Sequence, residues 1–237
     1  MITLCSLRGP GTLPSESPFC FKLENYLKLT KRDYRVVFPT LPTKAPKGKF
    51  PFIEDNGRMI GDSGFIIDYL KATYGDSLDD GMSPVEQATA LAFRRLFEEN
   101  LYWSMFYGRW FDDANWPATR RKTFAHLPLP LRLFIPALVH RSLWKQVQGH
   151  GMGRHAPAEI YKIGLDDLRA VSAFLGDKPY FMGDRPRSID ATAHAFLALI
   201  SFRPVILPTR AEIDKLTNLK AYAARMHQAL FGVAPSA

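Results

Sequence analysis

The sequence is poor in cysteine and has no long uninterrupted hydrophobic run. Its 2 cysteines, Cys5 and Cys20, are too few for a disulfide framework and favour a reducing compartment. The most apolar stretch, residues 127–139, contains Arg132 and three prolines, so it is not expected to cross a bilayer. The first residues lack the basic and then apolar pattern of a secretion signal. These absences favour a cytoplasmic protein.

Acidic residues are missing from one long segment. Between Ala114 and Ala158 there is no Asp or Glu, while seven basic residues occur there and carry most of the net charge of +8. They are Arg120, Arg121, Lys122, Arg132, Arg141, Lys145 and Arg154. Such a local basic field attracts anionic small molecules, membrane surfaces or nucleic acid. No nucleic-acid-binding motif accompanies the charge, so a nucleic-acid partner is not expected.

The first 75 residues alternate between strand and helix patterns. Helices are expected to begin at Ser17-Pro18 and at Asp62-Ser63, because each pair supplies a capping residue or a proline at a helix start. Strand patterns occur at residues 2–7, 34–38, 51–54 and 58–60. The resulting order, β-α-β followed by β-β-α, is the layout of thioredoxin. Residues 1–75 are therefore expected to form a thioredoxin-like domain.

Strand patterns largely disappear after a polar connection at residues 76–83. Residues 84–237 are expected to form an all-helical domain, which makes the whole chain an α+β protein. The segment 189–202 is apolar on nearly every side, so it is expected to be the buried axis of that domain. The other helices are expected at residues 84–113, with an apolar stripe at Val85, Ala88, Ala92 and Leu96, and at residues 158–175 and 211–231.

Four stretches of this sequence carry a family resemblance: residues 15–24 (SESPFCFKLE), 48–54 with 60–67, 98–103 with Arg109-Trp110, and 149–155 with 183–186 and 190–191. Together they resemble the glutathione transferase family, and more narrowly its failed-axon-connections/metaxin branch. The resemblance implies a homodimer that uses glutathione as a co-substrate. Two functions stay open: transfer of glutathione to a small electrophile, and a non-catalytic binding module that contacts an anionic membrane surface.

Ser17 lies in a Ser-Pro-Phe-Cys run that matches Cys-x-x-Cys with its first thiol replaced by a hydroxyl. Amide N–H groups at a helix N-terminus favour an anion and lower the pKa of a thiol held there. The resemblance assigns Ser17 a hydrogen bond to the glutathione thiolate. The alternatives are that Ser17 only caps the helix and that Cys20 only packs within it.

The resemblance also assigns residues to the rest of glutathione. It implies a cis peptide bond at Phe50-Pro51, with the backbone of Phe50 pairing with the cysteinyl part. Asp62 and Ser63 are expected to hold the ammonium and carboxylate of the γ-glutamyl end, while Lys47 and Lys49 supply charge for the glycyl carboxylate. The alternatives are a trans proline that starts an edge strand, ordinary capping of the helix, and loop lysines that are only solvated.

Eight aromatic residues lie within residues 93–111, more than one buried helix face needs. Tyr and Trp combine an apolar ring with a polar tip, which suits the wall of a ligand pocket. Core packing is the alternative for any of them. No metal is expected, because the histidines of residues 150–155 match no common ligand spacing. The expected wall for the acceptor substrate consists of Tyr102, Tyr107, Arg109 and Trp110.

Overall fold

The computed structural model describes residues 1–39, 42–125, 127–203, 205 and 207–236. Its N-terminal part contains a four-stranded sheet with the order β2-β1-β3-β4. Strand β2 runs parallel to β1, whereas β3 is antiparallel to both β1 and β4. The strands are β1 (Ile2–Cys5), β2 (Tyr34–Val37), β3 (Phe52–Asp55) and β4 (Arg58–Gly61).

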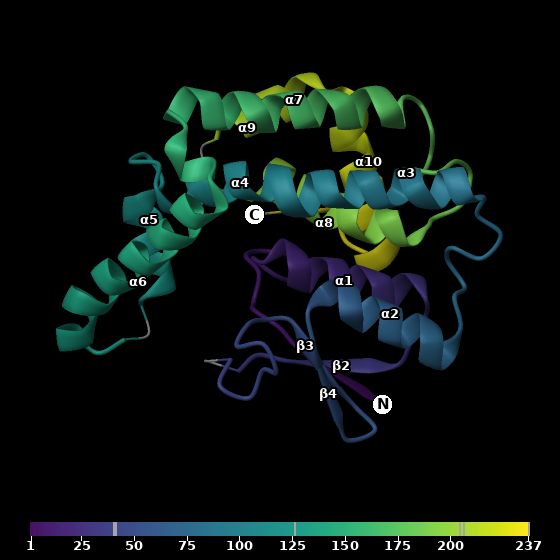
Figure 1. Cartoon of the computed structure of the whole chain (residues 1–237), viewed down its shortest axis with the longest axis horizontal. Helices are drawn as coiled ribbons and strands as arrows, with labels where there is room; N and C mark the ends of the chain where they lie inside the picture. The colour runs from purple at the N-terminus through teal and green to yellow at the C-terminus, as the bar shows by residue number, and fades with distance from the viewer. Residues whose placement is uncertain (40–41, 126, 204, 206, 237) are drawn as a thin grey trace.

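Two helices, α1 (Pro18–Leu29) and α2 (Ser63–Tyr74), lie between this sheet and the helical part of the molecule (Figure 1). Leu4 and Ile53 of the sheet belong to the same buried cluster as Leu23 and Ile66 of these helices. Burial of this apolar surface holds the helices on the sheet. The thioredoxin-like fold expected from the sequence is confirmed.

The C-terminal part is helical in the described residues. The helices are α3 (Pro84–Arg95), α4 (Tyr102–Trp110), α5 (Trp116–Thr123), α6 (Leu129–His150), α7 (Pro157–Leu175), α8 (Ser188–Phe202), α9 (Pro208–Lys215) and α10 (Thr217–Phe231). A π-helical segment, Leu96–Leu101, joins α3 to α4, and a short 3-10 turn, Met152–Arg154, precedes α7.

Helix α8 is the buried axis of this half, as predicted. Every residue from Ile189 to Ser201 is buried. Helix α1 packs directly on α8, and the side-chain amide of Asn25 donates a hydrogen bond of 3.0 Å to the backbone oxygen of Ala191. The α+β fold is thus held together by contact between its two halves.

Two helical details differ from the predictions. The predicted apolar stripe is largely solvent-facing: Val85 is 75% exposed, and Ala88 and Ala92 are also exposed, whereas Leu96 packs against the core. Phe93 and Phe97, on another side, reach the core instead. The segment 211–231 is not one helix, because α9 ends at Lys215 and α10 starts at Thr217.

Within the acid-free basic segment, helices α5 and α6 form a projecting hairpin, and these two helices are here called the arm (Figure 1). It extends away from the body at the side opposite the connection between α2 and α3. Among the described residues, none of the helices combines the length and the apolar composition needed to cross a membrane.

Candidate functional site

Ser17 occupies the N-cap position of α1 but does not cap it with its side chain. Its backbone is extended and its N–H donates a hydrogen bond of 3.2 Å to the hydroxyl of Ser15. The hydroxyl of Ser17 lies instead within hydrogen-bonding reach of the Cys20 thiol. Burial raises the pKa of Cys20, although hydrogen bonds to Leu7 and Ser17 oppose this. Cys20 is therefore a buried, protonated packing residue rather than a nucleophile.

The loop before β3 carries the predicted cis bond. The Phe50–Pro51 peptide is cis, Pro51 is buried, and the ring of Phe50 stacks on that of Phe52 at 5.9 Å. Lys49 is exposed, whereas the ammonium of Lys47 lies 4.0 Å from the ring centroid of Phe65 on α2. The loop therefore brings positive charge towards the start of α2.

Asp62 and Ser63 begin α2 in different ways. Asp62 has a positive φ of 81°, an uncommon conformation for a residue with a side chain. Its carboxylate accepts hydrogen bonds from the N–H groups of Gly64 at 2.9 Å and Phe65 at 3.4 Å, so it caps the helix. Ser63 is buried, and its hydroxyl accepts a hydrogen bond of 3.4 Å from Nζ of Lys22.

Lys22 is the charged residue that the sequence interpretation missed. It is 1% exposed, and its ammonium lies 2.5 Å from Oε1 of Glu98, which comes from the π-helical segment. Burial lowers the pKa of Lys22, and the charge of Glu98 opposes that shift. A signal did exist: α1 is buried on nearly every side, and a charge within such a helix must be paired.

The four residues expected to line the acceptor pocket divide into two groups. The ring of Tyr102 lies 4.9 Å from that of Phe19, and Nη2 of Arg109 is 2.8 Å from Oε2 of Glu16. The Arg109 guanidinium is also 5.0 Å from the ring centroid of Trp110. Tyr102 and Arg109 therefore contact the segment that contains Ser17, while Trp110 lies beside Arg109 and packs on Trp116 of α5. Burial raises the pKa of Tyr102 to about 12.

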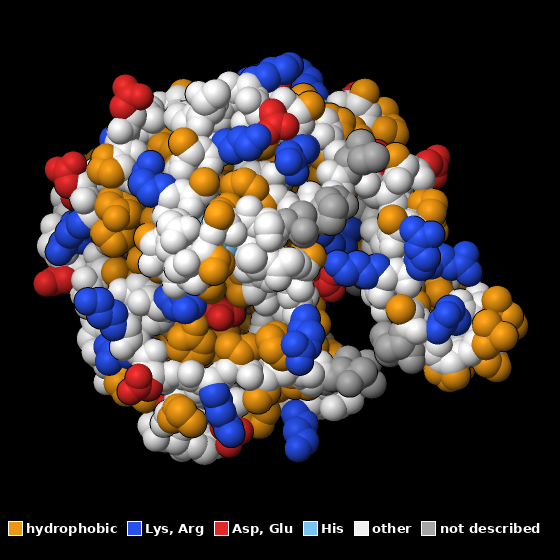
Figure 2. Space-filling model, turned by 180° about the vertical axis from the view of Figure 1, so that it is seen from behind, with side chains coloured by type: hydrophobic (Ala, Val, Ile, Leu, Met, Phe, Trp, Pro, Cys, Tyr) orange, Lys and Arg blue, Asp and Glu red, His pale blue; other side chains and the backbone are white. Residues whose placement is uncertain are grey.

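Tyr107 is not brought to that segment. It is 9% exposed and packs with Val147 and Ile160 beneath α6 and α7, with its ring 6.0 Å from that of Tyr161. Figure 2 shows a hollow between the arm and the rest of the molecule, with Lys and Arg side chains along its rim.

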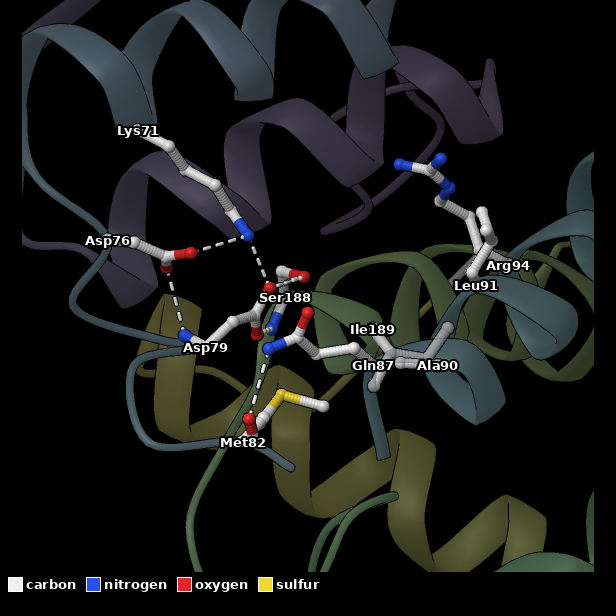
Figure 3. Close-up of a pocket in the computed structure, with 10 residues that line it drawn as sticks. All are labelled: Lys71, Asp76, Asp79, Met82, Gln87, Ala90, Leu91, Arg94, Ser188 and Ile189. Atoms are coloured by element: carbon white, nitrogen blue, oxygen red, sulfur yellow. Dashed lines mark hydrogen bonds and ion pairs between the residues drawn. The ribbon is translucent and has the colours of Figure 1, made fainter. Parts of the chain in front are cut away.

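The cavity shown in Figure 3 lies away from these residues. It has a volume of about 240 Å³ and is bordered by the connection between the halves and by α2, α3 and α8. In it, Lys71 pairs with Asp76 and Asp79, and Asp79 also accepts hydrogen bonds from the N–H and hydroxyl of Ser188. This polar junction ties the connection to both halves.

Comparison with known proteins places the chain in a class. The family model for the glutathione S-transferase N-terminal domain matches residues 18–115, and that for the glutathione S-transferase C-terminal domain matches residues 164–226. An isoprene-epoxide–glutathione S-transferase from Rhodococcus sp. (strain AD45) is 35% identical, over 96% of this chain and 98% of the relative. The chain belongs to the glutathione S-transferase family.

Within that family the chain falls in the branch of failed axon connections and the metaxins. Failed axon connections from Drosophila melanogaster is 32% identical over 92% of this chain and 55% of that protein. Metaxin-1 from Bos taurus is 30% identical over 92% of this chain and 71% of that protein.

Solved structures agree on the fold. The beta-etherase LigF from Sphingobium sp. strain SYK-6 has a TM-score of 0.67 at 17% identity and covers 98% of both chains. A glutathione S-transferase from Methylobacterium radiotolerans, in complex with glutathione sulfonate, has a TM-score of 0.63 at 18% identity and covers 100% of this chain and 95% of its own.

Proposed function

We propose that the protein transfers glutathione to a small electrophile. The observation that carries this proposal is the position of Ser17: it precedes the first turn of α1, and its hydroxyl is not used to cap that helix. The hydroxyl would donate a hydrogen bond to the glutathione sulfur, and the helix N-terminus would favour its negative charge. The 35% identical isoprene-epoxide relative supports the same chemistry.

In this reaction the thiol proton of glutathione leaves to solvent. The thiolate sulfur then forms a bond to the electrophilic carbon, and the electron pair of the broken bond goes to the leaving group or to an epoxide oxygen that takes up a proton. The protein contributes a lowered thiol pKa and positioning.

The remaining residues of the site hold the rest of glutathione. The backbone of Phe50 pairs with the cysteinyl part, Ser63 and Asp62 hold the γ-glutamyl end, and Lys49 supplies charge for the glycyl carboxylate. We add that Lys22 positions Ser63 without contacting glutathione itself, because its buried ammonium donates a hydrogen bond to the hydroxyl of Ser63. Our proposal also divides the chain into two domains, residues 1–75 and 84–237, joined by residues 76–83. It further includes that the protein forms a homodimer and is located in the cytoplasm.

The test compares two substitutions with different expected effects. Ser17→Ala should lower the rate of glutathione conjugation to 1-chloro-2,4-dinitrobenzene by at least about tenfold, with little change in glutathione affinity, because a hydrogen bond to a charged group is lost. Ser63→Ala should weaken glutathione binding instead. Ser83→Ala, which removes a cap on the surface of α3, is the control. Failure of the wild-type protein to bind millimolar glutathione in calorimetry would reject the proposal.

A second function is favoured by the free end of the arm. Leu131, Phe134 and Leu138 are 47%, 69% and 63% exposed. Arg141 and Lys145 continue the same series at intervals of three or four residues, so all five share one face of α6. Hydrophobic side chains gather at the tip of the arm in Figure 2. An apolar tip followed by basic side chains suits the interface of an anionic membrane.

Vesicle sedimentation tests this second function. The protein should bind phosphatidylcholine vesicles that contain phosphatidylserine, and binding should fall with salt because it depends on screened charge. The double substitution Phe134→Ser with Leu138→Ser should abolish binding, whereas Val85→Ser, which removes an equally exposed apolar side chain from α3, should not. Equal binding by both variants would show that the arm does not dock on lipid.

A further inference from the structure

A partly buried cluster of three charged residues lies immediately before α1. Oε2 of Glu16 is 2.8 Å from Nη2 of Arg109 and 3.6 Å from Nη2 of Arg203. The side chains of both arginines are 14% exposed and that of Glu16 is 22% exposed. We call these three residues the two-arginine cluster. Its parts come from the segment before Ser17, from the end of α4 and from the residue after α8.

The two-arginine cluster carries more positive than negative charge. Two guanidinium groups share one carboxylate oxygen, which leaves a residual charge of one unit. The carboxylate of Asp112, which follows α4, already accepts hydrogen bonds from the hydroxyl of Tyr161 and the N–H of Ala114. Nε of Arg109 is buried and has no hydrogen-bond partner within the described part of the chain.

The pKa of Arg203 reflects the same imbalance. Burial and, to a smaller extent, the neighbouring charge of Arg109 lower the pKa of Arg203 to about 9, and the charge of Glu16 offsets only part of this shift. An uncompensated charge away from bulk water is unfavourable. An added anion would remove that cost.

We propose that the two-arginine cluster binds a carboxylate carried by the electrophile, so that the protein selects anionic acceptors over neutral ones. This inference rests on the proposed transferase function. Glu16 directly precedes Ser17, so the two arginines that pair with Glu16 reach the segment that carries the proposed thiolate-binding hydroxyl. The forked guanidinium groups match the two oxygens of a carboxylate. The rings of Tyr102 and Trp110, which accompany Arg109, suit a planar acceptor.

The test measures binding of an unreactive matched pair by calorimetry, without glutathione: 3,5-dinitrobenzoate and its neutral analogue 3,5-dinitrobenzamide. The benzoate should bind at least about tenfold more tightly, as expected for charge-assisted hydrogen bonds. Arg203→Gln should remove this preference. Glu16→Gln should do the opposite and tighten benzoate binding without changing amide binding, because it removes the competing carboxylate.

The exposed ion pair between Arg95 and Glu99 supplies matched controls, Arg95→Gln and Glu99→Gln, which should change neither affinity. Equal affinity of the wild-type protein for the two compounds, or failure to bind either, would overturn the inference. Weaker benzoate binding by Glu16→Gln would also overturn it, even if Arg203→Gln fails to fold. Conjugation of glutathione to 4-chloro-3,5-dinitrobenzoate is measured separately. Preferential binding of the benzoate without conjugation would support the anion site and reject the transferase function. Conjugation without preferential binding of the benzoate would support the transferase function and reject the anion site.

Discussion

At the scale of single residues, the main electrostatic interaction near the candidate glutathione site is the buried ion pair between Lys22 and Glu98. Lys22 is 1% exposed, and its only close charged partner of opposite sign at salt-bridge distance in the described chain is Glu98. A buried pair of this kind adds little net stability relative to apolar residues, but removal of one partner leaves an uncompensated charge. The pair therefore fixes how α1 meets the π-helical segment.

Glu98→Gln should lower the free energy of unfolding by about 3–5 kcal/mol, since Lys22 is then buried without its counter-charge. The double variant Lys22→Met with Glu98→Gln should recover much of that loss. Urea unfolding followed by circular dichroism measures both. Asp166→Asn, which breaks the exposed pair with Lys162, is the control and should cost less than about 1 kcal/mol. A small effect of Glu98→Gln would mean that Lys22 is not held as a buried ammonium.

In the N-terminal half, residue patterns predicted where helices start better than they predicted side-chain partners. The starts of α1 and α2 follow from local sequence, whereas the cis bond at Phe50–Pro51 was expected from the family resemblance. The bond from Lys22 to Ser63 and the pairing of Arg109 with Glu16 join residues that are 41 and 93 positions apart. The sequence around each of these residues indicates a charged side chain on a helix or next to one, but it does not indicate which distant residue that side chain contacts.

At the scale of elements, the contact between α8 and α10 contains two buried histidines. His194 and His227 are 0% exposed, and their rings are 5.6 Å apart. Burial lowers the pKa of His194 to about 3, with a further contribution from His227, and burial also lowers the pKa of His227. Both rings are therefore neutral in the folded protein near neutral pH.

This neutrality makes stability depend on pH. The folded-state pKa of His194 lies below the unfolded value of about 6.5, so the unfolded chain binds more protons as the pH falls. Stability is fully present above that unfolded value and is lost progressively below it. Between pH 7.5 and pH 5.0, His194 alone should account for a loss of about 2 kcal/mol in the free energy of unfolding.

Urea unfolding at the two pH values measures this loss in the wild-type protein and in His194→Leu, in which the loss should shrink by that amount. His155→Gln, which removes a surface histidine between the 3-10 turn and α7, is the control. An unchanged pH dependence in His194→Leu would contradict a neutral, buried His194.

Helical periodicity predicted where elements lie more reliably than which side is buried. The segment 189–202 is apolar on nearly every side, so the only environment that suits it is the protein interior, and α8 is buried there. Helix α3 offered two apolar stripes, and the aromatic one at Phe93 packs in the core because it fills more volume than Val85 or Ala92. In the sequence the arm was marked by its basic charge and by the apolar stretch 127–139, but neither pattern shows that a hairpin projects from the body.

At the scale of the whole molecule, the two halves form one packed unit. Ala191 of α8 belongs to the same buried cluster as Leu4 of β1 and Leu27 of α1. The bond from Asn25 to Ala191 and the junction at Asp79 join the halves at two further places. Separation of the halves would expose apolar surface on both, so neither is expected to unfold alone.

The distribution of tryptophan allows this to be tested. All 4 tryptophans lie between Trp103 and Trp144, in the helical half, whereas circular dichroism reports on both halves. Urea transitions followed by tryptophan fluorescence and by circular dichroism should coincide in the wild-type protein. Asn25→Ala should move both transitions to lower urea concentration by the same amount. The free energy of unfolding should fall by about 1–3 kcal/mol, because the substitution leaves the buried backbone carbonyl of Ala191 without its hydrogen-bond donor. Thr89→Ala on exposed α3 should shift neither. A fluorescence transition that stays in place while the circular dichroism transition moves would mean that the halves unfold independently, and the contact between α1 and α8 would then not couple them.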